Sequence, residues 1–194
     1  MNAPAGLIGA AWEVQEQLSR AEFSFCFIGG LALQRWGEPR YTQDIDLTVL
    51  CPYGEELATA RRLAQLFQPR FAGAIDFTLE SRVFLARTAD GTPVDIAFGA
   101  IDFELRCIER ASAFDFGGDI RLFTCSAEDL IVMKVFANRE RDWPDVEAVV
   151  THHGASLDWE LIELELKPLL PLQGGQPAWE RLSELRRRLG EGRT

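Results

Sequence analysis

The sequence has no apolar run close to the roughly 20 residues that a transmembrane helix needs, so a membrane-spanning protein is not expected. Its first basic residue is Arg20, and a start without Lys or Arg lacks the basic region of a secretory signal. No internal repeat or low-complexity stretch is visible. We therefore expect a cytoplasmic protein without a membrane partner.

Histidine and paired cysteine are also scarce. The only histidines are the neighbours His152 and His153, and adjacent residues on a helix point in different directions. No two cysteines stand at C-x-x-C spacing, so a zinc site has little support. Each cysteine lies in or near an apolar stretch, and we expect buried free thiols rather than disulfides. The four cysteines are Cys26, Cys51, Cys107 and Cys125.

Positive charge is in deficit. The 20 basic residues face 30 acidic ones, which gives a formal net charge of −10. Nonspecific nucleic-acid binding usually needs a basic surface, so this balance argues against it. Local basic patches remain at Arg186–Arg188 and at Arg61 and Arg62, and we interpret both as solvated helix faces.

Short apolar runs alternate with helical patterns in the first two thirds of the chain, and only helical patterns follow. This order predicts an α+β fold, with a catalytic core at residues 1–124 and a helical C-terminal region at residues 125–194. The expected strands are 23–28, 44–50, 82–87, 93–98 and 120–123. The expected helices are 5–19, 31–36, 55–67, 101–111, 126–137, 145–152, 158–166 and 179–189.

Two aspartates stand at the start of an apolar strand. Asp44 and Asp46 are two residues apart, and such residues point to the same face of a strand. Paired carboxylates repel each other unless a cation or a proton neutralises them, and magnesium prefers such oxygen ligands. The alternative interpretation is a pair of solvent-facing aspartates that cap a turn at a sheet edge.

A third aspartate changes the balance between these interpretations. Asp95 lies between Val94 and Ile96 inside an apolar strand, where a charged side chain needs a partner. If this strand lies beside the first, three carboxylates converge. Three carboxylates around two metal ions form a phosphoryl-transfer site, in which one carboxylate can accept a proton.

A glycine pair precedes the aspartates. Gly29-Gly30 ends the strand 23–28 and opens a helix, whose N-terminal N–H groups can bind phosphate. A glycine pair alone indicates no more than a tight turn. Its place some fourteen residues before the paired aspartates is more specific.

This order of motifs resembles the polymerase-β nucleotidyltransferase superfamily. The string from Arg40 to Leu47, which reads Arg-x-Thr-x-Asp-Ile-Asp-Leu, resembles its AbiEii-type branch, known from type IV toxin–antitoxin systems. The segment from Ser126 to Asp145 is similar to the helical region of that branch. The resemblance covers roughly residues 23–150. It implies a nucleotidyltransferase-type mixed β-sheet flanked by helices, followed by an all-helical C-terminal part.

The resemblance also implies roles for single residues. Asp44 and Asp46 would hold magnesium or manganese, and Asp95 would be the third ligand and the general base for the attacking hydroxyl. Gly29 and Gly30 would bind the β- and γ-phosphates of a nucleoside triphosphate such as ATP.

Further residues would assist. Thr42 would support the metal loop or touch a phosphate, and Lys134 would lean toward the triphosphate. Asp142 would orient the helices or contact the acceptor. The alternative for Lys134 is a solvated lysine on a helix. In many relatives a serine takes the position of Gly30, so a side-chain contact to phosphate is in doubt here.

Three functions stay open at this point. The first is a magnesium-dependent nucleotidyltransferase that transfers a nucleoside monophosphate to a hydroxyl of tRNA or another RNA, a protein or a small molecule such as an aminoglycoside. It would act as a toxin controlled by an antitoxin protein. The second is a non-catalytic module of the same fold that binds nucleotide or a partner. The third is a structural protein with incidental acidic residues.

Overall fold

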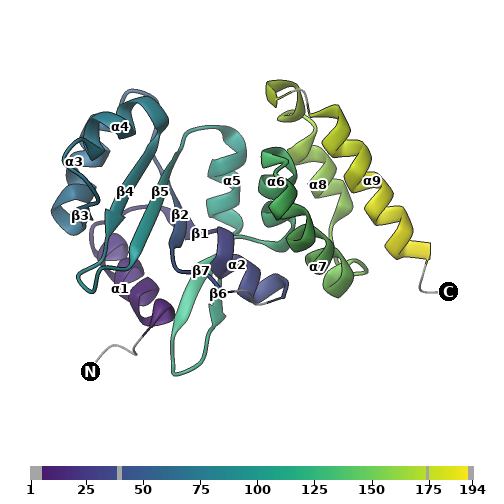
Figure 1. Ribbon diagram of the computed structural model, residues 1–194, viewed down its shortest axis with the longest axis horizontal. Helices are drawn as coiled ribbons and strands as arrows, with labels where there is room; N and C mark the ends of the chain where they lie inside the picture. The colour runs from purple at the N-terminus through teal and green to yellow at the C-terminus, as the bar shows by residue number, and fades with distance from the viewer. Residues whose placement is uncertain (1–5, 39–40, 174, 192–194) are drawn as a thin grey trace. The chain divides into compact units, whose positions relative to one another are not determined.

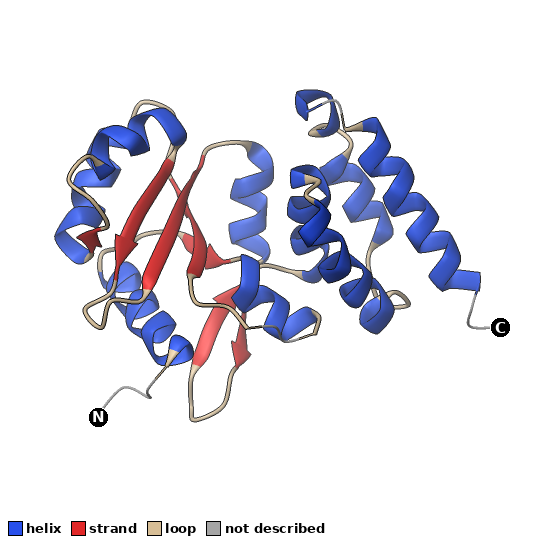
Figure 2. Ribbon diagram, in the orientation of Figure 1, coloured by secondary structure: helices blue, strands red, loops and turns tan. Residues whose placement is uncertain are grey.

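The computed structural model describes residues 6–38, 41–173 and 175–191. In this part of the chain, one compact unit comprises residues 6–31 and 41–125, and another comprises residues 32–38 and the chain from Ser126 onward. Every strand of the described residues lies in the first unit, and the second is built of helices (Figure 2). The predicted α+β fold class is therefore confirmed.

The first unit contains a seven-stranded mixed sheet in the order β3-β4-β5-β2-β1-β7-β6. Strand β2 pairs in parallel with β5 and antiparallel with β1, and β4 and β5 form an antiparallel hairpin. The seven strands are β1 (Phe25–Phe27), β2 (Ile45–Leu50), β3 (Gln68–Pro69), β4 (Val83–Arg87), β5 (Pro93–Gly99), β6 (Ser112–Asp115) and β7 (Arg121–Thr124).

The two central strands bury one face and leave the other face partly open. On β2 the side chains of Ile45, Leu47 and Val49 are completely buried, and Val94 and Ile96 lie beside them on β5. Because successive side chains of a strand point to opposite faces, the residues between them face the other side of the sheet. Apolar alternation thus fixes the register and directs the intervening polar residues away from the core.

Helices cover both faces of this sheet. Helices α1 (Leu7–Arg20), α3 (Glu56–Leu66) and α4 (Ala74–Ser81) lie on one side, where their apolar residues join the core of β2, β4 and β5 (Figure 1). Helix α5 (Asp102–Arg110) packs on the other side, against β1 and β2. The helix α2 (Gly29–Trp36) begins directly after β1.

The second unit is helical apart from its turns. Helix α6 contacts α7, α8 and α9. The elements of the second unit after residue 125 are α6 (Ala127–Ala137), the 3-10 turn η1 (Glu140–Asp142), α7 (Trp143–His153), α8 (Trp159–Leu166), the 3-10 turn η2 (Leu170–Gln173) and α9 (Gln176–Glu191). In the described residues, no helix combines the length and the apolar character needed to cross a bilayer.

The first turn of α6 is capped by a serine side chain. Ser126 Oγ accepts a hydrogen bond from the Asp129 N–H at 3.0 Å, which satisfies one donor of the first turn. We expect Ser126→Ala to lower the free energy of unfolding by about 1 kcal/mol, as for other N-cap serines. Urea titration measures the change. Ser183→Ala, at an exposed position of α9, is the matched control, and equal effects of both would contradict a capping role.

Several short elements were not predicted. Strand β3 has two residues, β6 is largely exposed, and α4 contains Ile75, Phe77 and Thr78, which have modest helix propensity. The predicted elements otherwise agree with the structure to within a few residues. The expected thiol state is also confirmed, because all four cysteines are buried and stand outside any disulfide.

Candidate functional site

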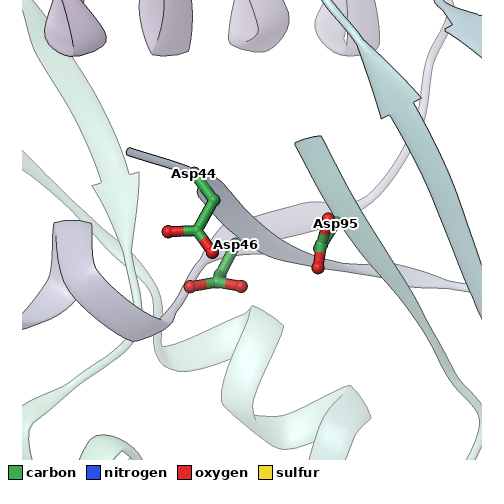
Figure 3. Close-up of side chains that lie close together, drawn as sticks. All are labelled: Asp44, Asp46 and Asp95. Atoms are coloured by element: carbon green, nitrogen blue, oxygen red, sulfur yellow. The ribbon is translucent and has the colours of Figure 1, made fainter. Parts of the chain in front are cut away.

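Three aspartates of the first unit come together at one end of the sheet. Asp44, Asp46 and Asp95 each offer a carboxylate oxygen, and these oxygens lie within 4.8 Å of one another. Figure 3 shows Asp44 and Asp46 on one segment and Asp95 on the neighbouring strand. Asp44 is exposed and the other two are partly buried, so the cluster is open to solvent.

The register of two strands explains why Asp46 meets Asp95. These residues are direct partners in the parallel pairing of β2 with β5. Their neighbours Ile45, Leu47, Val94 and Ile96 are buried in the core, so both aspartates point to the opposite face. The predicted adjacency of the two strands is thus confirmed.

Asp44 reaches the cluster in a different way from the expected one. It lies one residue before β2, which begins at Ile45, and not on the strand itself. Its carboxylate accepts a hydrogen bond from the Thr42 hydroxyl at 2.8 Å. This bond fixes the side chain in a loop that strand geometry does not constrain, and it gives Thr42 a supporting role in this segment.

The cluster carries a net negative charge, of which an arginine offsets only part. At 4.8 Å two unit charges repel each other by about 1 kcal/mol in water and about 3.5 kcal/mol at a typical protein surface. This repulsion favours a bound cation or a proton in the cluster. Hard oxygen ligands that are partly exposed suit a hydrated magnesium ion.

Gly29 lies directly against the cluster. Its φ is +57°, a conformation that residues with side chains rarely adopt, and a Cβ at this position would stand 2.2 Å from Asp46 Oδ2. The backbone is further tied to β2 by a hydrogen bond from Ile28 N–H to the Asp46 carbonyl, at 2.9 Å. The first turn of α2, whose N–H groups have no intrahelical acceptor, therefore begins next to a carboxylate of the cluster.

Gly30 leaves space for a threonine. A Cβ on Gly30 would stand 2.8 Å from Thr42 Oγ1 and 2.9 Å from its Cγ2. The Thr42 side chain thus occupies the space in which a serine at position 30 would begin. This packing gives a physical reason for glycine here, and it leaves the Thr42 hydroxyl as the side-chain oxygen beside Gly30.

One residue of the site carries no motif. Arg70, which directly follows β3, forms an ion pair with Asp95 Oδ1 through its Nη2 atom. No element was expected between residues 68 and 81, and a contact across 25 positions leaves no local pattern. Sequence reasoning could therefore not identify it.

Lys134 lies in the helical unit and is almost fully buried. Its ammonium donates to Asp142 at 3.3 Å and to Asp145 at 2.6 Å, and both carboxylates are buried. The interpretation of Lys134 as a solvated lysine is therefore wrong. Its role toward a triphosphate, and that of Asp142 toward an acceptor, stay predictions. Arg40 of the resemblance lies outside the described residues.

A protein-family model matches most of the chain. Residues 16–168 match the family described as the nucleotidyl transferase AbiEii toxin of type IV toxin–antitoxin systems. Comparison with curated proteins finds no significant match.

Three similar solved structures share low identity with the chain, and each has a TM-score of 0.48. An antigenic nucleotidyltransferase-like protein from Paracoccidioides brasiliensis is 14% identical, over 93% of this chain and 91% of that one. The antibiotic-resistance factor ANT(2'')-Ia in solution is 15% identical, over 90% and 96%. ANT(2'')-Ia in complex with adenylyl-2''-tobramycin is 19% identical, over 84% and 95%.

Proposed function

Because the chain belongs to the AbiEii family of nucleotidyl transferases, we propose that it transfers a nucleoside monophosphate from a nucleoside triphosphate to an acceptor hydroxyl and releases pyrophosphate. The observation that carries the proposal is the convergence of Asp44, Asp46 and Asp95 beside the Gly29 turn. A phosphoryl-transfer site needs both parts, which are ligands for divalent cations and a backbone that approaches phosphate closely.

The residues fit a pair of magnesium or manganese ions. All three ligands are hard oxygen donors on one solvent-accessible face, and their mutual repulsion favours occupancy by a cation. When bound, such ions supply charge neutralisation for the triphosphate and polarise the phosphorus that is attacked. Asp44 and Asp46 would hold them, with Asp95 as the third ligand.

The chain's own residues would do the rest. The acceptor oxygen forms a bond to the α-phosphorus, the bond to the β-phosphate oxygen breaks, and pyrophosphate leaves. The acceptor proton passes to the Asp95 carboxylate. The N–H groups at Gly29 and Gly30 would hold the β- and γ-phosphates, where the helix dipole of α2 favours negative charge. Thr42 would keep Asp44 in position through its hydroxyl.

Lys134 is kept in the proposal as a second source of positive charge for the triphosphate. Its ammonium is shared by Asp142 and Asp145, so a phosphate would compete with two carboxylates. The acceptor is left open among RNA, protein and a small molecule. Arginines of α9 give no reason to prefer RNA, since Arg187 and Arg188 pair with Glu184 and Glu147.

The biological setting belongs to the same proposal. The chain would act in the cytoplasm, where nucleoside triphosphates are available, as the toxin of a pair whose antitoxin restrains it. This part of the proposal rests on the family.

The test is an incorporation assay. The protein is incubated with each of the four α-labelled nucleoside triphosphates and magnesium, together with bulk tRNA, a protein extract or an aminoglycoside. We expect label in one acceptor class with one preferred nucleotide. Asp44→Ala removes an exposed ligand and should leave the acceptor unlabelled. Equal labelling by both proteins would exclude this site as the catalyst.

Calorimetry separates the non-catalytic alternative. A transferase should bind its nucleotide much more tightly with magnesium than without it, because ions held by the three carboxylates would neutralise the charge of the triphosphate. Binding that does not depend on magnesium, together with no labelled product, would favour the binding module.

A further inference from the structure

Arg70 is held firmly on the side of the site that faces β4. Its backbone N–H donates to the Leu85 carbonyl at 2.9 Å, which ties the residue to β4. The Nη2 atom donates to Asp95 and lies 3.4 Å and 3.5 Å from the carbonyls of Val94 and Ala86. The guanidinium is therefore fixed to the backbone of two strands as well as to the carboxylate.

Asp95 lies between this cation and the other two acids. Its partner on β4 is Leu85, and its partner on β2 is Asp46. The Asp95 carboxylate is thus attracted toward Arg70 on one side and repelled by Asp44 and Asp46 on the other. Arg70 is thus the positive group that the structure places against the Asp95 carboxylate.

The hydrogen bonds of Arg70 do not alone explain why its side chain lies against Asp95. Its Nε atom is buried and has no hydrogen-bond partner among the described residues. A buried donor without a partner is unfavourable, and in a native protein it calls for an explanation. The Arg70 and Asp95 side chains are also 25% and 34% exposed, so the pair adds little to stability as a surface ion pair.

We propose that Arg70 is the positioning residue of the third carboxylate. It holds Asp95 in the orientation in which a carboxylate oxygen of this residue completes the divalent-cation site with Asp44 and Asp46. This rests on the proposed function only in assigning the cations to that site. Arg70 would act through Asp95 and would not touch the nucleotide.

The direction of the effect separates positioning from simple electrostatics. A positive charge beside a cation site weakens cation binding, so removal of Arg70 should tighten binding if charge alone matters. If Arg70 positions Asp95, its removal lets the carboxylate turn away and binding becomes weaker. The two roles thus predict opposite changes in the dissociation constant.

The experiment is a double-mutant cycle read out by Mn²⁺ binding. Electron paramagnetic resonance gives the Mn²⁺ dissociation constant of the wild type, Arg70→Met, Asp95→Asn and the double variant, with folding checked by circular dichroism. We expect Arg70→Met to weaken binding about fivefold or more in the wild-type background and less than about twofold beside Asp95→Asn, as for directly coupled residues. Arg70→Lys should recover part of the loss.

A second arginine, Arg87, provides the control for Arg70→Met. Arg87→Met removes a charge from the exposed face of β4 and should leave the constant unchanged. Tighter binding in Arg70→Met, or equal weakening in both backgrounds, would overturn the proposal. Binding of Mn²⁺ without nucleotidyl transfer would count against the proposed function alone, and no Mn²⁺ binding by the wild type would overturn both.

Discussion

Asp46→Asn is expected to reduce nucleotidyl transfer at least about a thousandfold, since a metal ligand contributes several kcal/mol to the transition state and each 1.36 kcal/mol is a factor of ten. Asp46 is the member of the cluster that lies beside both Asp95 and the turn at Gly29. It is paired with Asp95 across the sheet, and its Oδ2 fills the space above Gly29. Loss of the Asp46 carboxylate should therefore affect both metal binding and the conformation of the Gly29 turn.

The same substitution should act differently on stability. In metal-free buffer it removes a charge from a self-repelling cluster, so the melting temperature should stay the same or rise. In magnesium the wild type should gain stability by mass action, and Asp46→Asn should gain little. Differential scanning calorimetry with and without magnesium measures both effects. Asp76→Asn, at an exposed position of α4, is the charge-matched control. An equal magnesium response of both variants would contradict the assignment.

Gly29→Ala is expected to lower the transfer rate about a hundredfold or more, which is the order of effect of a misplaced reacting group. A methyl group at this position would stand 2.2 Å from Asp46 Oδ2, so either the carboxylate or the turn must move. The left-handed conformation, with φ of +57°, adds strain to any side chain. The helix N-terminus and the metal ligand would both be displaced.

Gly91→Ala separates the effect of backbone strain from the effect of steric overlap with the added methyl group. Gly91 also has a positive φ, of +89°, but a Cβ there would meet no atom within 4 Å. We expect it to cost about 1 kcal/mol of unfolding free energy and to leave the transfer rate nearly unchanged. Transfer assays at saturating nucleotide and urea titrations compare the two. If Gly29→Ala is as active as Gly91→Ala, the glycine turn has no part in catalysis.

The core of the site could be predicted because its parts have local signatures. Apolar alternation predicts one strand that carries Asp44 and Asp46 and another that carries Asp95, with the carboxylates on the face opposite the core. The order of the motifs along the chain gave the resemblance to the family. Neither required knowledge of distant contacts, and the observed β2–β5 pairing agrees with both.

The rest depends on tertiary packing. Asp44 was expected on the strand, yet it lies in a loop where the Thr42 hydroxyl donates to its carboxylate. Arg70 stands 25 residues from Asp95 and reaches it across β4. Lys134 has two buried carboxylate partners, of which Asp145 stands 11 positions away. Side-chain contacts at such separations follow from the packed structure and not from periodicity or propensity.

The central claim is that the carboxylates of Asp44, Asp46 and Asp95 share divalent cations beside a nucleoside triphosphate. The most direct test is a crystal structure of the protein with Mn²⁺ and a non-hydrolysable nucleotide analogue, with data collected for anomalous scattering. Our account predicts anomalous peaks among the three carboxylates, with the triphosphate at the N-terminus of α2. Manganese bound elsewhere, with these three side chains contacting only solvent and protein, would contradict it.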